Sequence, residues 1–277
     1  MSDARFPKAK RSFGQNFLVD QSFVAKIVKA AALDDSSTVV EIGPGRGALT
    51  RELLRHAGKV VAIELDRDLA SLLREQFAGF PNFQLIEQDA LEVDFNEIAS
   101  ENGSLVKLVA NLPYNISTAV LSRLVDARYS FEAMVLMFQR EVVERITAAP
   151  PTSDRGYLTV MVEAFMNVER LFDVPPTAFR PVPKVWSSVV RLTSKDTTVF
   201  DTDRQLFTGL VSAAFRQKRK TLQNNLKHAT ELNISDASSL LTNAQIDPSR
   251  RAETLSISEW ESLFSELLRL RLGYTRK

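Results

Sequence analysis

The chain has 277 residues, and 35 Lys and Arg against 34 Asp and Glu leave a formal net charge of only +1. It contains no cysteine and two histidines, which excludes disulfides, thiolate nucleophiles and metal sites built from Cys or several His. The near-neutral charge argues against a strong overall field for nucleic acid. No apolar run approaches the roughly 18 residues of a membrane span, and the basic start lacks a signal-peptide core. We therefore expect a cytoplasmic protein with no metal and no membrane partner.

Short apolar runs rich in Val, Ile and Leu predict five strands in the first part of the chain. Between them, apolar residues recur at helical spacing and predict helices. Strands that alternate with helices indicate βαβ units and a mostly parallel sheet covered on both faces. The predicted strands are residues 38–42, 59–64, 83–87, 105–111 and 133–138, and the clearest helices are residues 48–56 and 67–77.

Beyond the fifth predicted strand the pattern changes. Residues 159–172 and 185–192 are predicted to form an antiparallel strand pair that finishes the sheet, joined by a proline-rich crossing over residues 174–184. A polar stretch then marks a boundary, and the sequence after it has helical apolar spacing throughout. We therefore predict an α/β domain over residues 1–195 and a small all-α domain over residues 196–277.

The first predicted strand runs into a glycine-rich turn, Gly43-Pro44-Gly45-Arg46-Gly47, before a helix. Glycines at such a turn let a ligand approach the backbone closely. Gly43-x-Gly45-x-x-Ala48 fits the dinucleotide fingerprint, and Glu64 lies where a ribose-binding acid is expected, so the loop alone is compatible with a nicotinamide or flavin enzyme. The stretch VVEIGPGRG also resembles motif I of class I methyltransferases that use S-adenosylmethionine (SAM), with Glu41 as the motif's acid.

The spacing of four residues helps to decide between these interpretations. Gly43, Glu64, Asp89 and Asn111 are 21, 25 and 22 residues apart, about one βα unit each. Each lies at or after the carboxyl end of a predicted strand, the edge where α/β sheets bind ligands. A SAM site uses all four: the glycine loop at the methionine part, Glu64 at the ribose, and Asp89 at the adenine with Ala90 beside it. A dinucleotide site gives Asp89 and Asn111 no special role.

The tetrapeptide Asn111-Leu112-Pro113-Tyr114 resembles the Asn/Asp-Pro-Pro-Tyr motif of methyltransferases that act on exocyclic amino groups of bases. The Asn111 side-chain oxygen and the Leu112 carbonyl can accept both N–H groups of such an amine. Pro113 stiffens the turn. Tyr114 offers a ring for base stacking, worth roughly 1–3 kcal/mol. Catalysis would come mainly from positioning the nitrogen in line with the methyl group.

Together these motifs, with others along the chain, resemble the family of ribosomal RNA adenine dimethyltransferases, and within it the small-subunit branch. The stretches that carry the resemblance are RSFGQNFLVD (11–20), VVEIGPGRGALT (39–50), VAIELDRDLA (61–70), QDAL (88–91), NLPYNIST (111–118), QREVVERI (139–146), VPPTAFRPVPKVWSSVVRL (174–192), FRQKRKTLQNNL (215–226) and RRAETLSISEW (250–260).

The resemblance implies a class I SAM-dependent methyltransferase fold, Rossmann-like with a mostly parallel sheet, and a C-terminal helical domain. It implies transfer of four methyl groups, two to N6 of each of two adjacent adenosines near the 3′ end of 16S rRNA, by a monomer during small-subunit maturation. It assigns cofactor contacts to Asn16 and Leu18, and places Phe179 against the target base opposite Tyr114. Trp186 departs from the small or acidic residue expected there.

Basic residues cluster in two places, which we interpret as phosphate contacts rather than solvated faces. The net charge of +1 would then arise because these basic clusters are offset by an acidic cofactor crevice containing Glu41, Glu64 and Asp89. The first cluster is Arg5, Lys8, Lys10 and Arg11, and the second is Arg216, Lys218, Arg219, Lys220 and Lys227.

Three alternatives stay open at this point. The nearest is a large-subunit rRNA adenine methyltransferase of the macrolide-resistance type, which would share the same site. A second is a ribosome or transcription factor that keeps the fold without catalysis, although the intact Asn111 and Tyr114 argue against it. The most distant is a nicotinamide-dependent dehydrogenase.

Overall fold

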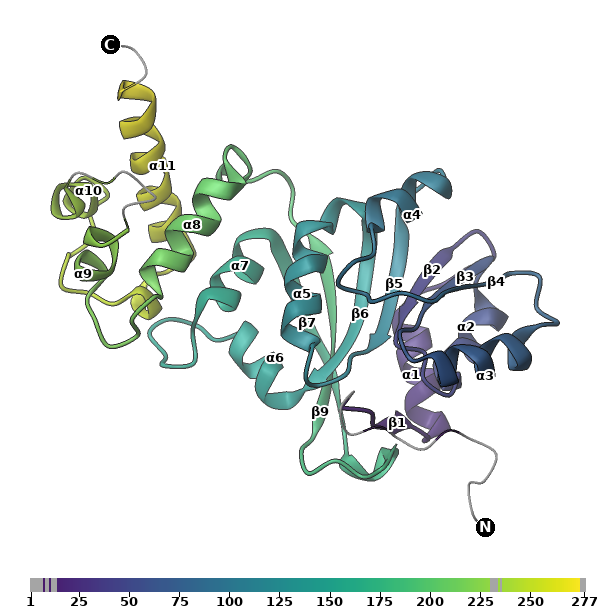
Figure 1. Ribbon diagram of the computed structural model, residues 1–277. Helices are drawn as coiled ribbons and strands as arrows, with labels where there is room; N and C mark the ends of the chain where they lie inside the picture. Colours follow the sequence, from purple (N-terminus) through teal and green to yellow (C-terminus); the bar gives the residue numbers. More distant parts are fainter. Residues whose placement is uncertain (1–6, 8–9, 11–13, 230–233, 235, 275–277) are drawn as a thin grey trace. The chain divides into compact units, whose positions relative to one another are not determined.

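The computed structural model describes residues 7, 10, 14–229, 234 and 236–274 (Figure 1). Internal contacts divide the chain into two compact units. We call the first unit, Met1–Val143 with Asn167–Ser194, the catalytic unit after the activity that the family resemblance implies for it, and the second, Glu144–Met166 with Lys195–Lys277, the helical unit. The last crossing between the units falls between Ser194 and Lys195. We did not predict that Glu144–Met166 would belong to the helical unit.

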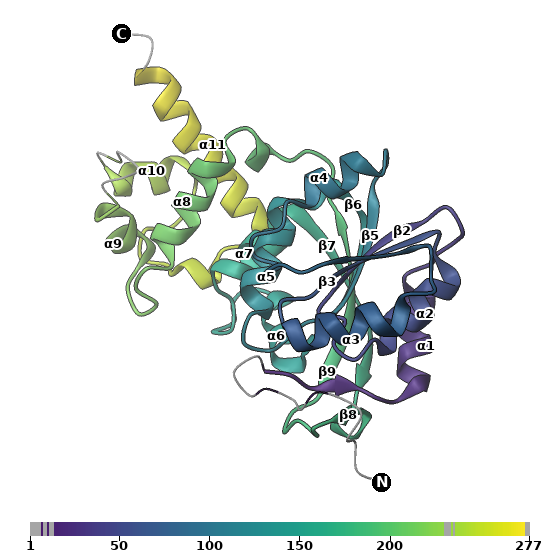
Figure 2. The ribbon, with the colours of Figure 1, turned by 45° about the vertical axis from the view of Figure 1, so that its right-hand side comes forward.

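The catalytic unit is built on a seven-stranded sheet of order β4-β3-β2-β5-β6-β9-β7 (Figure 1 and Figure 2). The first five strands of this sheet along the chain are mutually parallel, and β9 runs antiparallel to β6. The prediction of a mostly parallel sheet is therefore confirmed. The strands are β2 (Thr38–Ile42), β3 (Lys59–Ile63), β4 (Phe83–Ile86), β5 (Val106–Asn111), β6 (Phe131–Gln139), β7 (Met166–Val174) and β9 (Ser187–Ser194).

Helices connect these strands, and those predicted over residues 48–56 and 67–77 are confirmed with the same bounds. One apolar cluster joins side chains of the first three helices to the sheet. A separate two-stranded sheet pairs β1 (Phe17–Leu18) with β8 (Phe179–Arg180), which follows the 3₁₀ turn η3 (Pro176–Ala178). The helical elements are α1 (Gln21–Ala30), α2 (Ala48–His56), α3 (Arg67–Phe77), α4 (Phe95–Glu101), α5 (Ser117–Asp126), η2 (Arg128–Ser130) and α6 (Arg140–Ile146).

The apolar run predicted as a strand over residues 159–172 is only half a strand. Its first part is helix α7 (Tyr157–Phe165), and β7 begins at Met166. The start of the helix is fixed by Thr159, whose hydroxyl accepts a hydrogen bond from the Gly156 N–H (3.1 Å) and donates one to the Arg145 carbonyl (2.9 Å). A continuous apolar run does not distinguish a buried helix from a buried strand, so the sequence pattern was ambiguous here.

In the helical unit, α7 packs against α8 and α11. This packing explains why residues 144–166 join this unit. Its core is aromatic: the rings of Phe200 and Phe207 stack with centroids 4.1 Å apart, and Phe264 packs edge-on against Phe207 at 5.3 Å. The predicted all-α character is confirmed. The remaining helical elements are η4 (Val199–Asp201), α8 (Arg204–Ala214), α9 (Leu222–Lys227), α10 (Ala237–Asn243), η6 (Ala252–Thr254) and α11 (Ile257–Tyr274).

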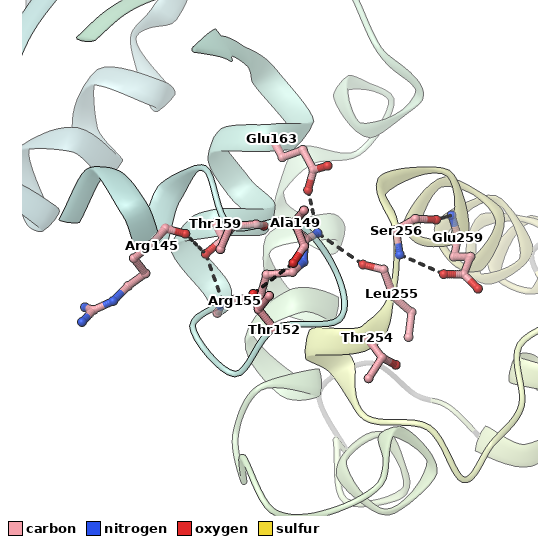
Figure 3. Close-up of polar contacts among 12 residues, drawn as sticks. Arg145, Ala149, Thr152, Arg155, Thr159, Glu163, Thr254, Leu255, Ser256 and Glu259 are labelled. Atoms are coloured by element: carbon pink, nitrogen blue, oxygen red, sulfur yellow. Dashed lines mark hydrogen bonds and ion pairs between the residues drawn. The ribbon is translucent and has the colours of Figure 1, made fainter. Parts of the chain in front are cut away.

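A buried guanidinium, that of Arg155, ties three segments of the helical unit together (Figure 3). Its Nη2 lies 2.6 Å from a carboxylate oxygen of Glu163 on α7 and donates to the Leu255 carbonyl at 3.2 Å. Its Nη1 donates to the Ala148 carbonyl at 2.7 Å. Arg155 therefore fastens the chain before α7 to the segment that leads into α11.

Across the described part of the chain, no helix combines the length and apolarity that crossing a membrane requires.

Candidate active site

A cavity of about 280 Å³ opens at the carboxyl edge of the parallel strands, within the catalytic unit. Because the carboxyl ends of parallel strands meet at one edge, residues far apart in sequence converge there. The structure places ten of the predicted site residues in the lining. These are Asn16, Gly43, Gly45, Glu64, Asp89, Ala90, Asn111, Leu112, Pro113 and Tyr114.

The glycine-rich turn leaves β2 in a conformation that requires glycine. Gly43, Gly45 and Gly47 all have positive φ angles, of 66°, 59° and 78°, which L side chains rarely adopt. A Cβ on Gly45 would lie 3.0 Å from the ring of Phe17. The turn therefore allows the N-terminal segment to pack directly against the backbone of the glycine loop.

Glu64, at the end of β3, is nearly fully buried and is held by main-chain donors. Its carboxylate accepts hydrogen bonds from the N–H of Gly45 (3.3 Å) and of Asp66 (2.9 Å). Burial raises the pKa of Glu64, and these two hydrogen bonds oppose that shift. The carboxylate is thus oriented from the glycine loop on one side and from the start of α3 on the other.

Glu41 does not lie in the crevice where we expected it. Its side chain is buried and does not line the cavity, and one carboxyl oxygen accepts a hydrogen bond from the Thr50 hydroxyl of α2 at 2.7 Å. Burial raises the pKa of Glu41 to about 8, and the hydrogen bond from Thr50 opposes the shift. The expectation of Glu41 in an acidic crevice is therefore wrong: it joins β2 to α2.

Asn111, at the end of β5, is oriented by a residue that the sequence places far away. Its amide nitrogen donates to the main-chain carbonyl of Asn16 at 3.2 Å. With the nitrogen so engaged, the amide oxygen is presented as an acceptor. The next residue, Leu112, has a buried side chain, and its N–H donates to the Met137 carbonyl of β6 at 3.3 Å. Both predicted acceptor positions are thus held in place by main-chain carbonyls of neighbouring segments.

Tyr114 lines the same cavity, and its hydroxyl lies 3.1 Å from the hydroxyl of Ser187 on β9. Burial raises the pKa of Tyr114, and the contact with Ser187 opposes the shift, so the phenol is neutral near pH 7. Nothing in the sequence singled out Ser187. Its role depends on the pairing of β9 with β6, which carries it to this edge of the sheet.

The N-terminal segment is fastened over the cavity by residues whose sequence pattern did not predict this role. The Lys10 ammonium lies 2.7 Å from carboxylate oxygens of both Asp66 and Asp68, and Gln15 donates to Asp66 at 3.1 Å. Arg46 lies over the Phe17 ring, with 4.5 Å between its guanidinium carbon and the ring centroid.

Lys10 was predicted to contact RNA phosphate, and the structure instead pairs it with two carboxylates of the same unit. That interpretation of Lys10 is therefore corrected. The other members of the first basic cluster, Arg5, Lys8 and Arg11, lie outside the described residues.

Two residues assigned from the family resemblance are not in the cavity. The side chains of Leu18 and Phe179 are buried in the apolar core shared with α1, and their backbones pair between β1 and β8. Phe179 is fully buried, so it presents no ring surface to a base opposite Tyr114, and the expected sandwich is not present. The proline-rich crossing turns this ring inward, as composition alone would favour.

The second basic cluster forms an exposed loop between α8 and α9. Arg216, Lys218, Arg219 and Lys220 are all exposed, and Lys227 is exposed at the end of α9. The loop is held from inside by Asn225, whose buried amide donates to the carbonyls of Ala214 (2.6 Å) and Gln217 (3.2 Å). The cations are thus displayed on a fixed turn.

No group of three or more His, Cys, Asp or Glu side chains that could hold a metal ion occurs among the residues with described positions.

Comparisons with known proteins find a family whose members match most of this chain. A family model described as "Ribosomal RNA adenine dimethylase" matches residues 6–267. A "Ribosomal RNA small subunit methyltransferase A" from Clostridium botulinum is 44% identical over 259 residues, covering 92% of this chain and 93% of the relative. A protein of the same name from Dehalococcoides mccartyi is 44% identical over 260 residues, covering 94% and 88%.

Two solved structures extend the likeness to the fold. A dimethyladenosine transferase from Plasmodium falciparum superposes with a TM-score of 0.78 at 28% identity, covering 91% of this chain and 98% of the other. The 23S rRNA methyltransferase ErmE gives a TM-score of 0.65 at 27% identity, covering 91% and 99%. With the family model matching most of its length, the chain belongs to the ribosomal RNA adenine dimethylase family.

Proposed function

We propose that this protein transfers methyl groups from SAM to N6 of adenosine in the 16S rRNA of the small ribosomal subunit. Two methyl groups would go to each of two adjacent adenosines near the 3′ end, during maturation of the subunit. The observation that carries the proposal is the hydrogen bond from Asn111 to the Asn16 carbonyl. It leaves an amide oxygen facing a cavity of cofactor size, as binding an exocyclic amine requires.

The residues at the cavity fit SAM. Glu64 is a carboxylate fixed by two main-chain donors, suited to accept hydrogen bonds from both ribose hydroxyls. Asp89 is oriented by the Leu91 N–H at 2.9 Å and would accept from the adenine amino group, with Ala90 beside it. Gly43 and Gly45 carry no side chain that would exclude the methionine part. When bound, SAM supplies a methyl group already activated on a sulfonium, so neither a metal nor a strong base is needed.

The acceptor side follows from Asn111 to Tyr114. The Asn111 amide oxygen and the Leu112 carbonyl would hold the two N–H groups of the target amine and favour tetrahedral geometry at nitrogen. Pro113 restricts the backbone between them and Tyr114. Tyr114, with its hydroxyl held by Ser187, would stack on the base. These residues act by positioning the nitrogen rather than by removing a proton.

The second methylation of one base meets a nitrogen with a single remaining hydrogen. One of the two acceptors, Asn111 or Leu112, must then lose its partner. The pocket therefore has to let the first methyl group rotate aside, and release of monomethyladenosine as the final product would contradict this part of the proposal.

The exposed loop Arg216–Lys220 is the proposed contact with ribosomal RNA. Its cations would neutralise phosphates, whereas the shape of the subunit would contribute most of the selection for a protein of net charge +1. We further propose that the protein acts as a cytoplasmic monomer.

A large-subunit substrate is the second candidate, since ErmE is a 23S rRNA methyltransferase and shares the fold. The small subunit is favoured because relatives at 44% identity carry the small-subunit name, against 27% for ErmE. A non-catalytic factor is disfavoured by the arrangement of Asn111 and Tyr114 at the cavity.

The test is incubation of the protein with labelled SAM and small subunits that lack these methyl groups, with large subunits in parallel. We expect label as dimethyladenosine in 16S rRNA alone, and its loss in Asn111→Ala. Label in 23S rRNA would favour the second candidate, whereas equal label with Asn111→Ala would remove the assigned site. Calorimetric titration with SAM and with NAD separates a methyltransferase from a dehydrogenase.

A further inference from the structure

An exposed apolar patch lies on the loop between β8 and β9 of the catalytic unit. Val182 is 54% exposed, Val185 42% and Trp186 46%. A single exposed apolar side chain needs no explanation, but three within five residues, one of them tryptophan, form a contiguous feature of the kind that marks a binding surface.

The patch adjoins the candidate active site through the backbone of β9. Trp186 directly precedes Ser187, whose hydroxyl contacts the hydroxyl of Tyr114. The Trp186 carbonyl accepts a hydrogen bond from the N–H of Arg140 at 2.9 Å, which continues the pairing of β9 with β6 by one residue. Trp186 is therefore anchored at the carboxyl edge of the sheet, where Asn111 ends β5.

The charged residues within the loop that carries the patch are all basic. Residues 174–186 include Arg180 and Lys184 and no acidic residue, and both cations are exposed. Pro181 and Pro183 restrict the backbone of the loop. An exposed indole flanked by cations on a stiff loop is the combination that binds unpaired nucleotides, by stacking on the base and pairing with phosphate.

We propose that Trp186, supported by Val182 and Val185, is a stacking platform for the nucleotide adjacent to the target adenosine, with Arg180 and Lys184 contacting its phosphates. This inference rests on the proposed function, under which two adjacent adenosines are modified in turn. While one base stacks on Tyr114, its neighbour has to be held outside the cavity. Trp186 precedes Ser187, the residue that holds Tyr114, at the same edge of the sheet, and we assign its exposed ring to that neighbour.

The chain provides its own reporter for this contact. It has two tryptophans, and Trp260 is fully buried in the helical unit. Trp186 is thus the one that iodide can reach and that a stacked base can quench. We would titrate the full chain, saturated with S-adenosylhomocysteine to prevent turnover, with a short RNA hairpin whose loop carries two adjacent adenines. We expect the RNA to quench the tryptophan emission of the wild type and to protect it from quenching by iodide. In Trp186→Phe, where only Trp260 emits, the RNA should cause neither change.

Steady-state methylation of small subunits then measures the contribution of the platform. Trp186→Ala should raise KM for the subunit roughly 5- to 150-fold, the range that stacking of one base supports, with kcat little changed. Trp186→Phe should retain most of the affinity. The matched control is Leu105→Ala: Leu105 is 53% exposed but lies before β5, at the opposite edge of the sheet, and its replacement should leave KM unchanged.

The outcomes separate the two levels of inference. If the wild type methylates small subunits but Trp186→Ala has an unchanged KM and RNA does not quench Trp186, the platform is overturned and the proposed function stands. Quenching by ribosomal protein and not by the RNA would also overturn it. If the wild type transfers no methyl group to the subunit, the proposed function fails and the platform fails with it. Unchanged thermal melting of Trp186→Ala excludes misfolding.

Discussion

The side-chain amide of Asn111 and the main-chain carbonyl of Asn16 meet at 3.2 Å across 95 residues of sequence. This hydrogen bond joins the N-terminal segment to the end of β5 and fixes which end of the amide faces the cavity. It thereby completes the cavity wall and selects the acceptor atom for the proposed substrate. Its consequences can be separated by mutation.

Two replacements of Asn111 separate the role of its amide oxygen as an acceptor from the role of its amide nitrogen, which is hydrogen-bonded to the Asn16 carbonyl. Asn111→Asp keeps an oxygen of the same reach but loses the N–H donor and places a charge near the Asn16 carbonyl. Asn111→Ala loses both. We expect Asn111→Ala to lower kcat by roughly 10²–10³, the scale of removing one preorganised polar group. Both variants should weaken cofactor binding, because both lose the hydrogen bond to Asn16, but Asn111→Asp should retain more of kcat. Single-turnover methylation and calorimetry with SAM separate the two effects. Unchanged kcat in Asn111→Ala would refute the assignment.

The hydroxyl pair of Tyr114 and Ser187 should behave as a unit. Tyr114→Phe or Ser187→Ala should each raise KM for RNA a few-fold, because the ring is no longer held by the hydrogen bond, worth about 0.5–1.5 kcal/mol. The double variant should be no worse than either single one. A double-mutant cycle on KM measures this coupling. Strict additivity of the two changes would show that the 3.1 Å hydroxyl pair does not orient the ring.

Glu41 predicts a pH dependence of stability. Its folded-state pKa of about 8 lies above the usual 4.5, so folding favours the neutral carboxyl. The stability that the neutral Glu41 carboxyl contributes is fully present below about pH 4.5. It is lost as the pH rises towards 8, because in this window the carboxyl ionises in the unfolded chain but stays neutral in the folded one. Glu41→Gln keeps an acceptor for Thr50 and cannot ionise. Its stability relative to the wild type should therefore grow between about pH 5 and 8 in urea unfolding. The exposed Glu75→Gln serves as control, and parallel curves for Glu41→Gln and wild type would contradict the shift.

Arg155 should be a large contributor to the stability of the helical unit. Its side chain is 1% exposed, and replacing it by Ala leaves Glu163 and two carbonyls without their donor. We expect a decrease of about 3–5 kcal/mol in unfolding free energy. Arg269→Ala removes an ion pair to Glu266 of comparable length from a side chain that is 67% exposed, and should lower the unfolding free energy far less, because solvent screens an exposed pair. Similar decreases in the two variants would show that burial does not set the value.

The basic loop predicts a salt dependence of RNA binding. Replacing Arg219 and Lys220 with Ala should weaken binding and reduce the slope of log K against log salt by about 0.7–0.9 for each phosphate that is no longer neutralised. Filter binding to small subunits at several KCl concentrations measures this. The double variant Arg55→Ala/Arg74→Ala removes the same charge from exposed positions of the catalytic unit, and should leave the slope unchanged. An unaltered slope in the loop variant would contradict the proposal that this loop neutralises RNA phosphates.

Local patterns predicted the parallel strands, the glycine turn and the residues that follow each strand. Apolar period, glycine content and the position of Glu64 or Asn111 after a strand are properties of short segments. Topology then brings such positions to one edge, so the cavity lining followed from the spacing.

Long-range packing accounts for what the sequence did not predict. Ser187 reaches Tyr114 only because β9 pairs antiparallel with β6. Glu41 is absent from the cavity lining because it is buried between β2 and α2, where its carboxyl is bonded to the Thr50 hydroxyl. Phe179 was placed at the base from resemblance, whereas the pairing of β8 with β1 directs it into the core. Each of these depends on a partner that no local pattern identifies.

The described residues that line the cavity all lie within the first 116 of the chain, yet two of them are held by partners that come later. The strand that flanks β5 on its far side, β6, is made later, and Ser187 later still. A polypeptide stopped after α5 would carry all the lining groups and still lack the hydroxyl that holds Tyr114. During synthesis, the residues of the methyl-donor half of the site are therefore made early. The acceptor half is finished only when β9 has been made.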